Sequence, residues 1–275
     1  MSGVTRIGAR EFRWGERTYV MGIINLTPDS FSADGLAGRT DEAVSRALEM
    51  EAQGADIVDL GGESTRPQAP RVDAEEELAR VLPVLERLVP RLKVPISIDT
   101  YRAVTARRCL EAGAHMINDV WGLKRDPELV REVSEKGVPV VITANQRDSP
   151  AKGDIVAEVK ADLERGIELA LRAGVLRENI ILDPGIGFGK TLEQNLALVW
   201  RLGELKDLGR PLLRGTSRKS FIGAVLELPS EERLEGTAAT VAIGIARGAD
   251  IVRVHDVRPM VRLCRMSDAV VRGRW

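Results

Sequence analysis

The sequence predicts a single (β/α)8 barrel of the TIM type with a short N-terminal hairpin, and three observations lead to this prediction. Eight short apolar runs recur along the 275 residues, each followed by a polar residue, a loop and a segment with helical spacing. This alternation predicts a parallel sheet, and runs that are apolar throughout predict strands buried on both faces. Eight such units fit a closed barrel better than an open, doubly wound sheet. The chain shows no linker or low-complexity tract, so we expect residues 1–275 to form one domain.

The predicted elements follow one another in a regular order. The apolar runs lie at residues 18–25, 55–63, 95–100, 115–119, 139–145, 179–184, 211–217 and 250–256. Helical spacing is clear at 41–53, 74–88, 104–112 and 156–173. Before the first run, FRWGERT (12–18) predicts a small hairpin, which would close the bottom of the barrel. The polar loops at 25–35 and 64–74 have lengths that are usually functional in a compact barrel.

Composition narrows the class of protein and of partner. A formal net charge of −1 and a pI of about 6.3 favour neither a nucleic-acid partner nor a membrane surface. The chain has no long apolar span, and its N-terminus lacks the apolar core of a signal peptide. Cys109 and Cys264 lie far apart in helical patterns, which argues against a zinc cluster and for ordinary thiols in a reducing compartment. We therefore expect a cytoplasmic protein.

The stretch NIILDPGIGFGK (179–190) indicates how such a barrel presents a functional group. Its apolar run ends at one carboxylate, Asp183, and a Pro/Gly cluster then turns the backbone before a helical pattern near Lys190. We therefore expect an acid at the mouth of a strand, beside backbone that can approach a ligand closely. A lone Gly-rich loop is weak evidence, but the same layout recurs along the chain.

A polar residue lies at the end of each predicted strand. These residues are Asn25, Glu63, Asp99, Asn118, Asn145, Asp183, Ser217 and His255. In a barrel of this type the active site lies at the C-terminal ends of the strands, and helix capping alone does not readily account for all eight. Arg253 faces the same way as His255, and the loop after the seventh run adds Arg218 and Lys219. His115 opens the fourth strand at the opposite end, so we expect it to be structural.

These side chains predict two adjoining pockets. Asp99, Asn118 and Asp183 offer carboxylate and amide groups that suit a flat heterocycle with several N–H donors. Residues of the last two strands suit phosphate, which barrels commonly hold there with backbone amides, helix N-termini and cations. The residues of this second pocket are Ser217, Arg218, Lys219, Arg253 and His255. Asn25, with Asp29 nearby, could add a magnesium ligand.

At this point the chain resembles the dihydropteroate synthases. The matching stretches are MGIINLTPDSFS (21–32), DLGGESTRP (59–67), SIDT (97–100), INDV (117–120), LDPGIGFGK (182–190), SRKSFIG (217–223) and RVHDV (253–257). They occur in the order of that family and cover nearly the whole chain. The resemblance implies a transferase of folate synthesis, which condenses 6-hydroxymethyl-7,8-dihydropterin diphosphate with 4-aminobenzoate, releases pyrophosphate and requires magnesium. Because family members are commonly dimers, it also implies a homodimer.

Carried over by motif, the resemblance implies a role for each candidate residue. The pterin would be held by Asp99, Asn118, Asp183 and Lys219. The diphosphate would be held by Asn25, Arg253 and His255, with Asn25 near the magnesium ion. The 4-aminobenzoate would meet Ser217 through its carboxylate and Phe188 through the wall of its pocket. Two loops that the family folds over its substrates carry Phe31, Thr65, Arg66 and Pro67. The residues expected to act most directly in the reaction are Asp99, Lys219, Arg253 and His255.

Three places depart from the family pattern. After the fifth strand the family usually carries a Met-His-Met stretch whose second methionine packs on the pterin, whereas this chain has Thr143-Ala144-Asn145. We therefore expect Asn145 to face the pocket and weaken pterin affinity slightly, a loss that Asn145→Met would reverse. Arg214 stands where an aliphatic residue is expected, and its parity predicts that it points toward the helix layer and pairs with an acid there. Residues 68–71 replace a loop that usually starts with glycine.

Two other functions stay open from the sequence. A folate-dependent methyltransferase would share the barrel and the pterin pocket, but it would need no diphosphate site, so SRKSFIG and RVHDV argue against it. A non-catalytic or repurposed pterin-binding barrel would account for Asn145 and Arg214. Binding measurements with pterin diphosphate, pyrophosphate and 4-aminobenzoate would discriminate among the three.

Overall fold

Eight parallel strands form the barrel in the computed structural model, which describes residues 3–27, 35–64 and 71–273, with residues 35–38 described by their backbone alone. The strands are β3 (Tyr19–Asn25), β4 (Ile57–Gly61), β5 (Ile96–Asp99), β6 (Met116–Asp119), β7 (Val140–Thr143), β8 (Ile180–Asp183), β9 (Leu213–Arg214) and β10 (Ile251–Val254). Each pairs with its neighbour in the order β8-β7-β6-β5-β4-β3-β10-β9, and a parallel bridge between Leu182 and Leu212 joins the two ends. The predicted barrel is confirmed, and each strand lies within one of the eight apolar runs.

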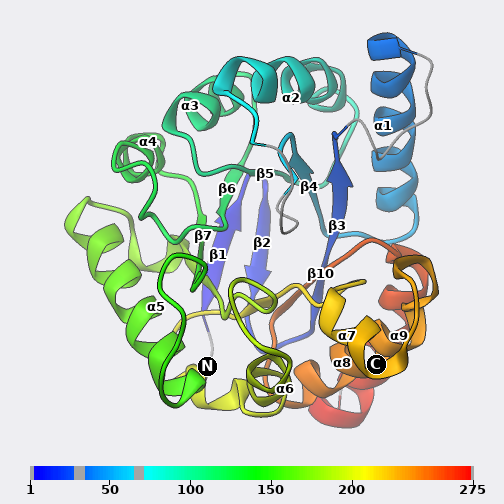
Figure 1. Ribbon diagram of the computed structural model, residues 1–275. Helices are drawn as coiled ribbons and strands as arrows, with labels where there is room; N and C mark the ends of the chain where they lie inside the picture. Colours follow the sequence, from blue (N-terminus) through cyan, green and yellow to red (C-terminus); the bar gives the residue numbers. More distant parts are fainter. Residues whose placement is uncertain (1–2, 28–34, 65–70, 274–275) are drawn as a thin grey trace.

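Helices surround the strands as a ring (Figure 1). They are α1 (Gly35–Ala52), α2 (Ala74–Leu88), α3 (Ala103–Glu111), α4 (Leu129–Lys136), α5 (Ile155–Arg172), α6 (Leu192–Trp200), α7 (Ser220–Leu226), α8 (Leu234–Ala246) and α9 (Val257–Arg272), with short 3-10 turns η2 (Arg177–Asn179), η3 (Leu202–Leu208) and η4 (Ser230–Glu232). Local caps explain several starts: the side chain of Asp73 accepts a hydrogen bond at the start of α2, Asp154 does so at α5, and Thr191 forms a capping box at α6. All four helices expected from spacing are present, α1 beginning upstream of its predicted start.

Alternation along each strand separates the inside of the barrel from the helix layer. On β4, Ile57 belongs to the apolar cluster inside the barrel, whereas Val58 and Leu60 belong to the cluster between strands and helices. Asp59 and Gly61 therefore face inward with Ile57. The other inward residues of this lower layer are Met21, Met116, Val141, Ile181, Leu213 and Ile251. An apolar floor thus lies beneath the polar residues at the strand ends.

A hairpin closes the bottom of the barrel, as predicted, but the predicted residues were wrong. Strand β1 (Val4–Ile7) pairs antiparallel with β2 (Arg10–Arg13), and the hairpin lies at the centre of the ring in Figure 1. Gly8 turns the chain with a φ of 58°. Ile7 and Phe12 join the inner cluster, and the Phe12 ring lies 4.8 Å from that of Tyr19. Residues 14–18 connect the hairpin to β3 instead of forming its second arm.

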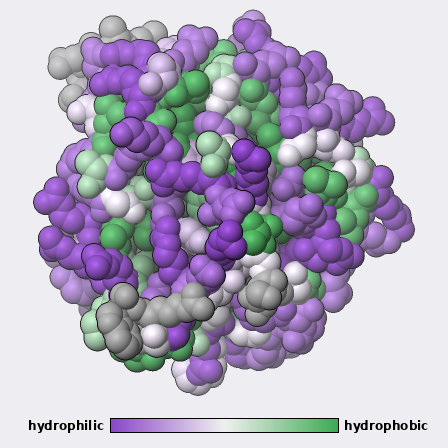
Figure 2. All heavy atoms as spheres, turned by 180° about the vertical axis from the view of Figure 1, so that it is seen from behind, coloured by the Kyte–Doolittle hydropathy of each residue, from purple (hydrophilic) through white to green (hydrophobic). Residues whose placement is uncertain are grey.

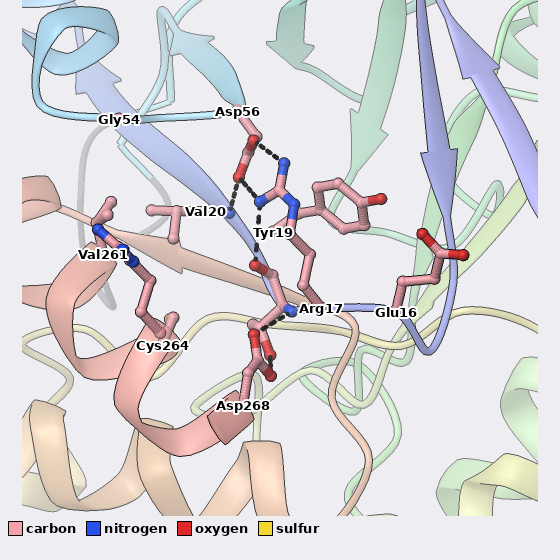
Figure 3. A pocket seen from close by; sticks show the side chains of 11 residues that line it. Glu16, Arg17, Tyr19, Val20, Gly54, Asp56, Val261, Cys264 and Asp268 are labelled. Carbon is pink, nitrogen blue, oxygen red and sulfur yellow. Dashed lines mark hydrogen bonds and ion pairs between the residues drawn. The ribbon is translucent and has the colours of Figure 1, made fainter. Parts of the chain in front are cut away.

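A cleft of about 360 Å³ lies at this N-terminal end, between the segment before β3 and α9 (Figure 3). Arg17 donates to both oxygens of Asp56, at 2.9 and 2.6 Å. The carboxylate of Asp268 accepts from the backbone N–H of Thr18 at 2.7 Å and from its hydroxyl at 2.8 Å. These pairs join the segment before β3 to the segment before β4 and to helix α9. We call this group of residues the foot of the barrel.

His115 and the two cysteines lie where the sequence predicts them. His115 precedes β6 at the N-terminal end, as predicted, and its Nδ1 accepts from the backbone N–H of Ile96 at 3.0 Å, which agrees with a structural role. Cys109 on α3 and Cys264 on α9 are free and buried, as expected of ordinary thiols. Burial raises the pKa of each thiol to about 12.

Hydrophilic side chains cover most of the face shown in Figure 2, where hydrophobic residues form small separate groups. Among the helices of the described residues, none has the length and apolarity needed to cross a membrane.

Candidate active site

The C-terminal ends of the strands, which we call the mouth, bring most of the predicted residues together above the apolar floor. Asp99 ends β5, Asn118 lies on β6 and Asp183 ends β8, and all three side chains are buried. The register pairs Asp99 with Asn118 on neighbouring strands, and Asp183 pairs with Thr143 at the end of β7. Asn25 ends β3 and is half-buried. The geometry therefore agrees with the predicted grouping of two acids and an amide.

Arg253 is held by two acids inside the mouth. Its Nε donates to Asp59 at 2.6 Å and its Nη2 donates to Asp99 at 2.7 Å. The amide of Asn118 donates to the same Asp59 oxygen at 3.1 Å. The other Asp59 oxygen is fully buried and has no hydrogen-bond partner among the described residues. Arg253, predicted to serve the diphosphate, thus also orders the heterocycle pocket.

Asp59 is a site residue that the sequence interpretation missed. The second apolar run was taken to end at Glu63, whereas β4 ends at Gly61. Glu63 lies outside the barrel interior network and pairs instead with Arg102 at 2.6 Å. Counting inward positions from Ile57 in steps of two would have found Asp59.

Burial shifts the pKa values of the charged groups in the mouth. Burial raises the pKa of Asp99 to about 7, opposed by Arg253 and reinforced by Asp59. Burial also raises the pKa of Asp183, against the attraction of Lys219. Conversely, burial lowers the pKa of Lys219 to about 8, with Asp183 opposing. Such shifted groups, gathered at one end of a barrel, mark a candidate functional site.

Two cationic side chains lie over the ring of Phe188. Lys219 places its Nζ 4.7 Å from the ring centre and donates to the carbonyl of Ile186. The guanidinium carbon of Arg147, from the loop after β7, lies 4.8 Å from the same centre. Phe188 itself is buried. Arg147 was not among the predicted residues, because it follows the end of β7 by four positions and no strand pattern places it.

Ser217 and His255 form a pair just beyond the ends of β9 and β10. The hydroxyl oxygen of Ser217 accepts from the backbone N–H of His255 at 3.2 Å and lies 3.0 Å from the imidazole Nδ1. Burial first, and then the charges of Arg253 and Arg218, lower the pKa of His255 to about 3. The imidazole is therefore neutral at neutral pH, with one ring nitrogen carrying a proton and the other acting as an acceptor. His255 can offer a hydrogen bond to an anion but no positive charge.

Arg218, which was counted among the anion-binding cations, is engaged elsewhere. Its Nε and Nη2 donate to Asp256 at 3.0 and 2.5 Å. Its backbone N–H donates to Thr237, and its own φ is 57°. With Arg218 engaged in this ion pair, Arg253 is the cation that contacts Asp99, and Lys219 is the one whose charge acts most strongly on Asp183.

Asn145 differs from the expectation of a side chain that faces a ligand. It is buried just beyond β7, where its Nδ2 donates to the carbonyl of Val120 at 2.7 Å and its Oδ1 accepts from the N–H of Arg147 at 3.1 Å. The amide therefore joins the loops after β6 and β7. Replacing it with methionine would break both hydrogen bonds, so the expected gain from Asn145→Met is withdrawn.

Arg214 points toward the helix layer, as predicted, but the predicted acidic partner is wrong. A side chain at Gly244 of α8 would collide with its guanidinium, because a Cβ there would lie 2.2 Å from Nη1. Arg214 is almost completely buried, and none of its three guanidinium nitrogens has a hydrogen-bond partner among the described residues. Burial lowers its pKa to about 10. The glycine makes room for the side chain without supplying a counter-charge.

Four predicted residues cannot be placed. Phe31, Thr65, Arg66 and Pro67 lie outside the described residues.

A magnesium ion fits the donors of the mouth only if the ligand shares in its coordination. Within residues 3–27, 35–64 and 71–273, no group of three His, Cys, Asp or Glu side chains could hold a metal ion. Asn25 offers one amide oxygen at the end of β3. Magnesium is commonly bound through one or two protein oxygens together with substrate phosphates and waters. The donor set therefore suits a metal that arrives with a diphosphate.

Comparisons with known proteins agree with this geometry. Residues 21–255 match the family described as pterin binding enzyme. The dihydropteroate synthase of Clostridium beijerinckii is 50% identical over 97% of this chain and 99% of its own length, and that of Bacillus subtilis is 50% identical over 93% of this chain and 90% of its own. A Clostridium difficile dihydropteroate synthase crystallised with pteroic acid superposes with a TM-score of 0.92 at 50% identity, covering 94% of this chain and 98% of that one. One from Xanthomonas albilineans in complex with 7,8-dihydropteroate gives 0.90 at 39% identity, covering 97% and 98%. This chain therefore belongs to the pterin-binding enzyme family and, within it, to the dihydropteroate synthases.

Proposed function

We propose that the mouth binds 6-hydroxymethyl-7,8-dihydropterin diphosphate and 4-aminobenzoate and joins them to give 7,8-dihydropteroate and pyrophosphate. The observation that carries this proposal is the inward cluster of Asp99, Asn118 and Asp183 around Arg253 and beside Lys219. A pterin ring presents several N–H groups along one edge, and buried carboxylates are the acceptors that suit them. A relative crystallised with pteroic acid supports the substrate class.

In this proposal Asp183 is the main acceptor for the pterin. Its Oδ1 already accepts from the backbone N–H of Gly185 at 2.7 Å, which fixes the carboxylate plane. Asp99 shares an oxygen with Arg253, so its second oxygen is the one open to the ring. Lys219 lies over the aromatic ring of Phe188 and interacts electrostatically with Asp183, and in this proposal it donates to a carbonyl or nitrogen of the pterin ring. These groups orient the pterin and exchange no proton with it.

The diphosphate would lie toward β3 and β10, beside Asn25, Arg253 and His255. Cleavage of the C–O bond to the diphosphate leaves positive charge at the methylene carbon of the pterin. The aromatic amine then forms the new C–N bond at this carbon and loses one proton to the departing pyrophosphate or to water. Arg253 offers permanent positive charge to the leaving group, and neutral His255 would offer an Nε2–H in the tautomer whose Nδ1 accepts from Ser217. We assign no general base, since positioning and charge account for the proposed roles.

Magnesium, bound through Asn25 and the diphosphate, would neutralise charge on the leaving group. Asn25→Ala is expected to raise the magnesium concentration needed for half-maximal activity. Isothermal calorimetry of Mg²⁺ with pyrophosphate, on the wild type and Asn25→Ala, checks the same assignment by binding.

The 4-aminobenzoate would pack on Phe188 and direct its carboxylate toward Ser217. The Ser217 hydroxyl lies 3.0 Å from Nδ1 of His255, and its O–H would turn toward the carboxylate when that substrate binds. Phe31, Thr65, Arg66 and Pro67 remain assigned by resemblance to the loops over this pocket. The amine end of the substrate then faces the pterin methylene group.

We also propose a cytoplasmic homodimer. The two free thiols agree with a reducing compartment. Large hydrophobic side chains are exposed on neighbouring outer helices, among them Trp200 of α6, with 61% of its surface exposed, and Ile243 of α8. Sedimentation velocity on the wild type and Trp200→Lys would test the assembly, since a dimer built on this face would dissociate.

The decisive experiment for the reaction is a coupled assay with pterin diphosphate, 4-aminobenzoate and Mg²⁺, together with calorimetry of each ligand. Formation of dihydropteroate and pyrophosphate in equal amounts is expected. Binding of pterin without any turnover would indicate a repurposed pterin-binding barrel. Binding of pterin without measurable pyrophosphate binding would favour a methyltransferase-like barrel.

A further inference from the structure

The ammonium of Lys190 lies between the loops that follow β7 and β8. Its Nζ donates to the carbonyls of Ala144 at 2.9 Å, Gly185 at 2.8 Å and Phe188 at 3.3 Å. An ammonium group has three N–H donors and no acceptor, so these three carbonyls use its full capacity. No substrate donor or acceptor is required to explain its position.

The two loops approach each other more closely than side chains would allow. Gly185 has a φ of 70°, and a Cβ there would lie 1.9 Å from the carbonyl oxygen of Ala144. Backbone hydrogen bonds run from Ala144 N to Asp183 O at 2.9 Å and from Gln146 N to Phe188 O at 3.2 Å. Several carbonyl oxygens therefore converge in a small space, and the positive charge of Lys190 offsets their mutual repulsion.

The loop held in this way carries two of the proposed substrate contacts. Asp183 enters it and is oriented by the N–H of Gly185, and Phe188 leaves it with its carbonyl on Lys190. On the other side, Asn195 of α6 accepts from the N–H of Gly187 at 2.7 Å and donates to the carbonyl of Lys190 at 3.2 Å. The loop is thus anchored to β7 by Lys190 and to α6 by Asn195.

We propose that Lys190 is a positioning residue of the active site, which holds Asp183 and Phe188 in place for the pterin and the 4-aminobenzoate without touching either. This inference rests on the proposed function for its substrates. It makes a specific claim beyond stability: loss of the ammonium should impair the β8 side of the mouth and spare the β3–β10 side, where the diphosphate is proposed to bind.

Lys206 provides a matched control at the opposite end of the barrel. Its Nζ also donates to a backbone carbonyl, that of Gly248 at 3.0 Å, and to the carboxylate of Asp250 at 3.0 Å. Asp250 precedes β10, far along the strand direction from the mouth. Lys206→Met removes a comparable lysine contact and should lower stability without changing the site.

The experiment compares wild type, Lys190→Met and Lys206→Met by calorimetry with a dihydropterin that lacks diphosphate, and with Mg²⁺-pyrophosphate. Lys190→Met is expected to weaken pterin binding by roughly 10- to 100-fold, because a displacement of about 1 Å in a positioning group has effects of this size. Pyrophosphate binding should stay within about twofold of the wild type. Lys206→Met should leave both affinities unchanged. Lys190→Arg, whose planar fork cannot direct N–H groups at three converging carbonyls, should fold and show an intermediate loss.

Pterin affinity of Lys190→Met within twofold of the wild type would overturn the proposal. Equal weakening of pterin and pyrophosphate would also overturn it, since it would mean a general loss of structure. Hydrogen exchange of residues 183–189 separates this inference from the proposed function. If the wild type itself bound no pterin, the proposed function would fail, and faster exchange of this loop in Lys190→Met but not in Lys206→Met would still uphold the positioning role. Unchanged exchange would overturn it.

Discussion

The two ends of the barrel use the same residue types to different effect. At the foot, Arg17 donates twice to Asp56 and Asp268 accepts twice from Thr18, so these side chains satisfy one another (Figure 3). At the mouth, one oxygen of Asp59 and the hydroxyl of Thr143 are buried without a hydrogen-bond partner among the described residues. Each such group costs about 1–3 kcal/mol of stability. Because Asp59 and Thr143 lie among the side chains of the mouth, these groups are the ones that a bound ligand could pair with.

The difference also appears in the charges that each end must stabilise. Two acids and one arginine share a single hydrogen-bond network at the mouth, and burial raises the pKa of Asp99 to about 7 and lowers that of Lys219 to about 8. Groups whose pKa values lie near 7 change their protonation on ligand binding more readily than the groups of a fixed ion pair do. Changes at the mouth should therefore alter binding, whereas changes at the foot should alter stability.

The largest expected effect comes from Asp183→Asn. The substitution keeps the shape of the side chain but places an amide donor where the pterin needs an acceptor. Loss of two charge-assisted hydrogen bonds should weaken pterin binding by roughly 100-fold or more, with the free energy of unfolding little changed. Calorimetry with a dihydropterin and urea denaturation would measure both. Unaltered pterin affinity would remove Asp183 from the site and with it the contrast between the two ends.

Asp268→Asn is the corresponding test at the foot. The amide would lose the charge that binds Thr18 and the ion pair with Arg272, whose Nε lies 2.7 Å from the carboxylate. The free energy of unfolding should fall by about 2–4 kcal/mol, as is usual when a buried charged hydrogen-bond network is broken. Pterin affinity measured below the melting range should be unchanged. A selective loss of pterin binding with normal stability would show that the foot communicates with the mouth.

The pH dependence of pterin binding sharpens the comparison further. Protonation of Asp99, with a pKa of about 7, removes an acceptor as the pH falls, so affinity should decline below about pH 7. Loss of the proton from Lys219, with a pKa of about 8, and from Lys190, with a pKa of about 7, should weaken binding as the pH rises. A bell-shaped profile is therefore expected. His255, with a pKa of about 3, should contribute no step near pH 6.5.

The variant Lys219→Met should lose part of the decline in pterin affinity at high pH. A wild-type affinity that is flat from pH 5 to 9 would contradict these assignments.

Prediction from sequence succeeded where burial alone determines structure. All eight strands lie within apolar runs because strands covered on both faces need uninterrupted hydrophobic residues. Strand ends were placed too late, since polar residues after Gly61 and Thr143 belong to loops that continue the extended direction. The hairpin was predicted too late in the sequence because Phe12 and Trp14 are residue types that favour strands, whereas the turn of the hairpin depends on Gly8.

The candidate site was predictable to the extent that it lies at the ends of strands. The strand-end pattern located Asp99, Asn118 and Asp183, and strand parity would have located Asp59 had the end of β4 been known. Parity could not locate Arg147, because the course of a loop places that residue beside Phe188. It also could not predict that Lys190 joins two loops, since the carbonyl of Ala144 that it contacts is 46 residues away in sequence. It also gave Arg214 the right direction and the wrong partner, because direction is local and a partner depends on the neighbouring helix.

The smallest expected effect concerns Asn145→Met, where sequence and structure lead to opposite predictions. From the family pattern, methionine should restore an apolar contact with the pterin and improve affinity. In the structure the Asn145 amide joins Val120 to Arg147, so methionine would leave a carbonyl and an N–H without these partners. We expect the free energy of unfolding to fall by about 1–2 kcal/mol. Pterin affinity should fall by no more than about tenfold, because Arg147 and the Phe188 ring beneath it would be displaced. Denaturation and calorimetry on Asn145→Met and Asn145→Asp check this, because aspartate retains the acceptor for Arg147 and loses only the donor to Val120. Tighter pterin binding by Asn145→Met would show that the thioether contact outweighs both hydrogen bonds, and that this part of the mouth is organised by the ligand instead of by its own loops.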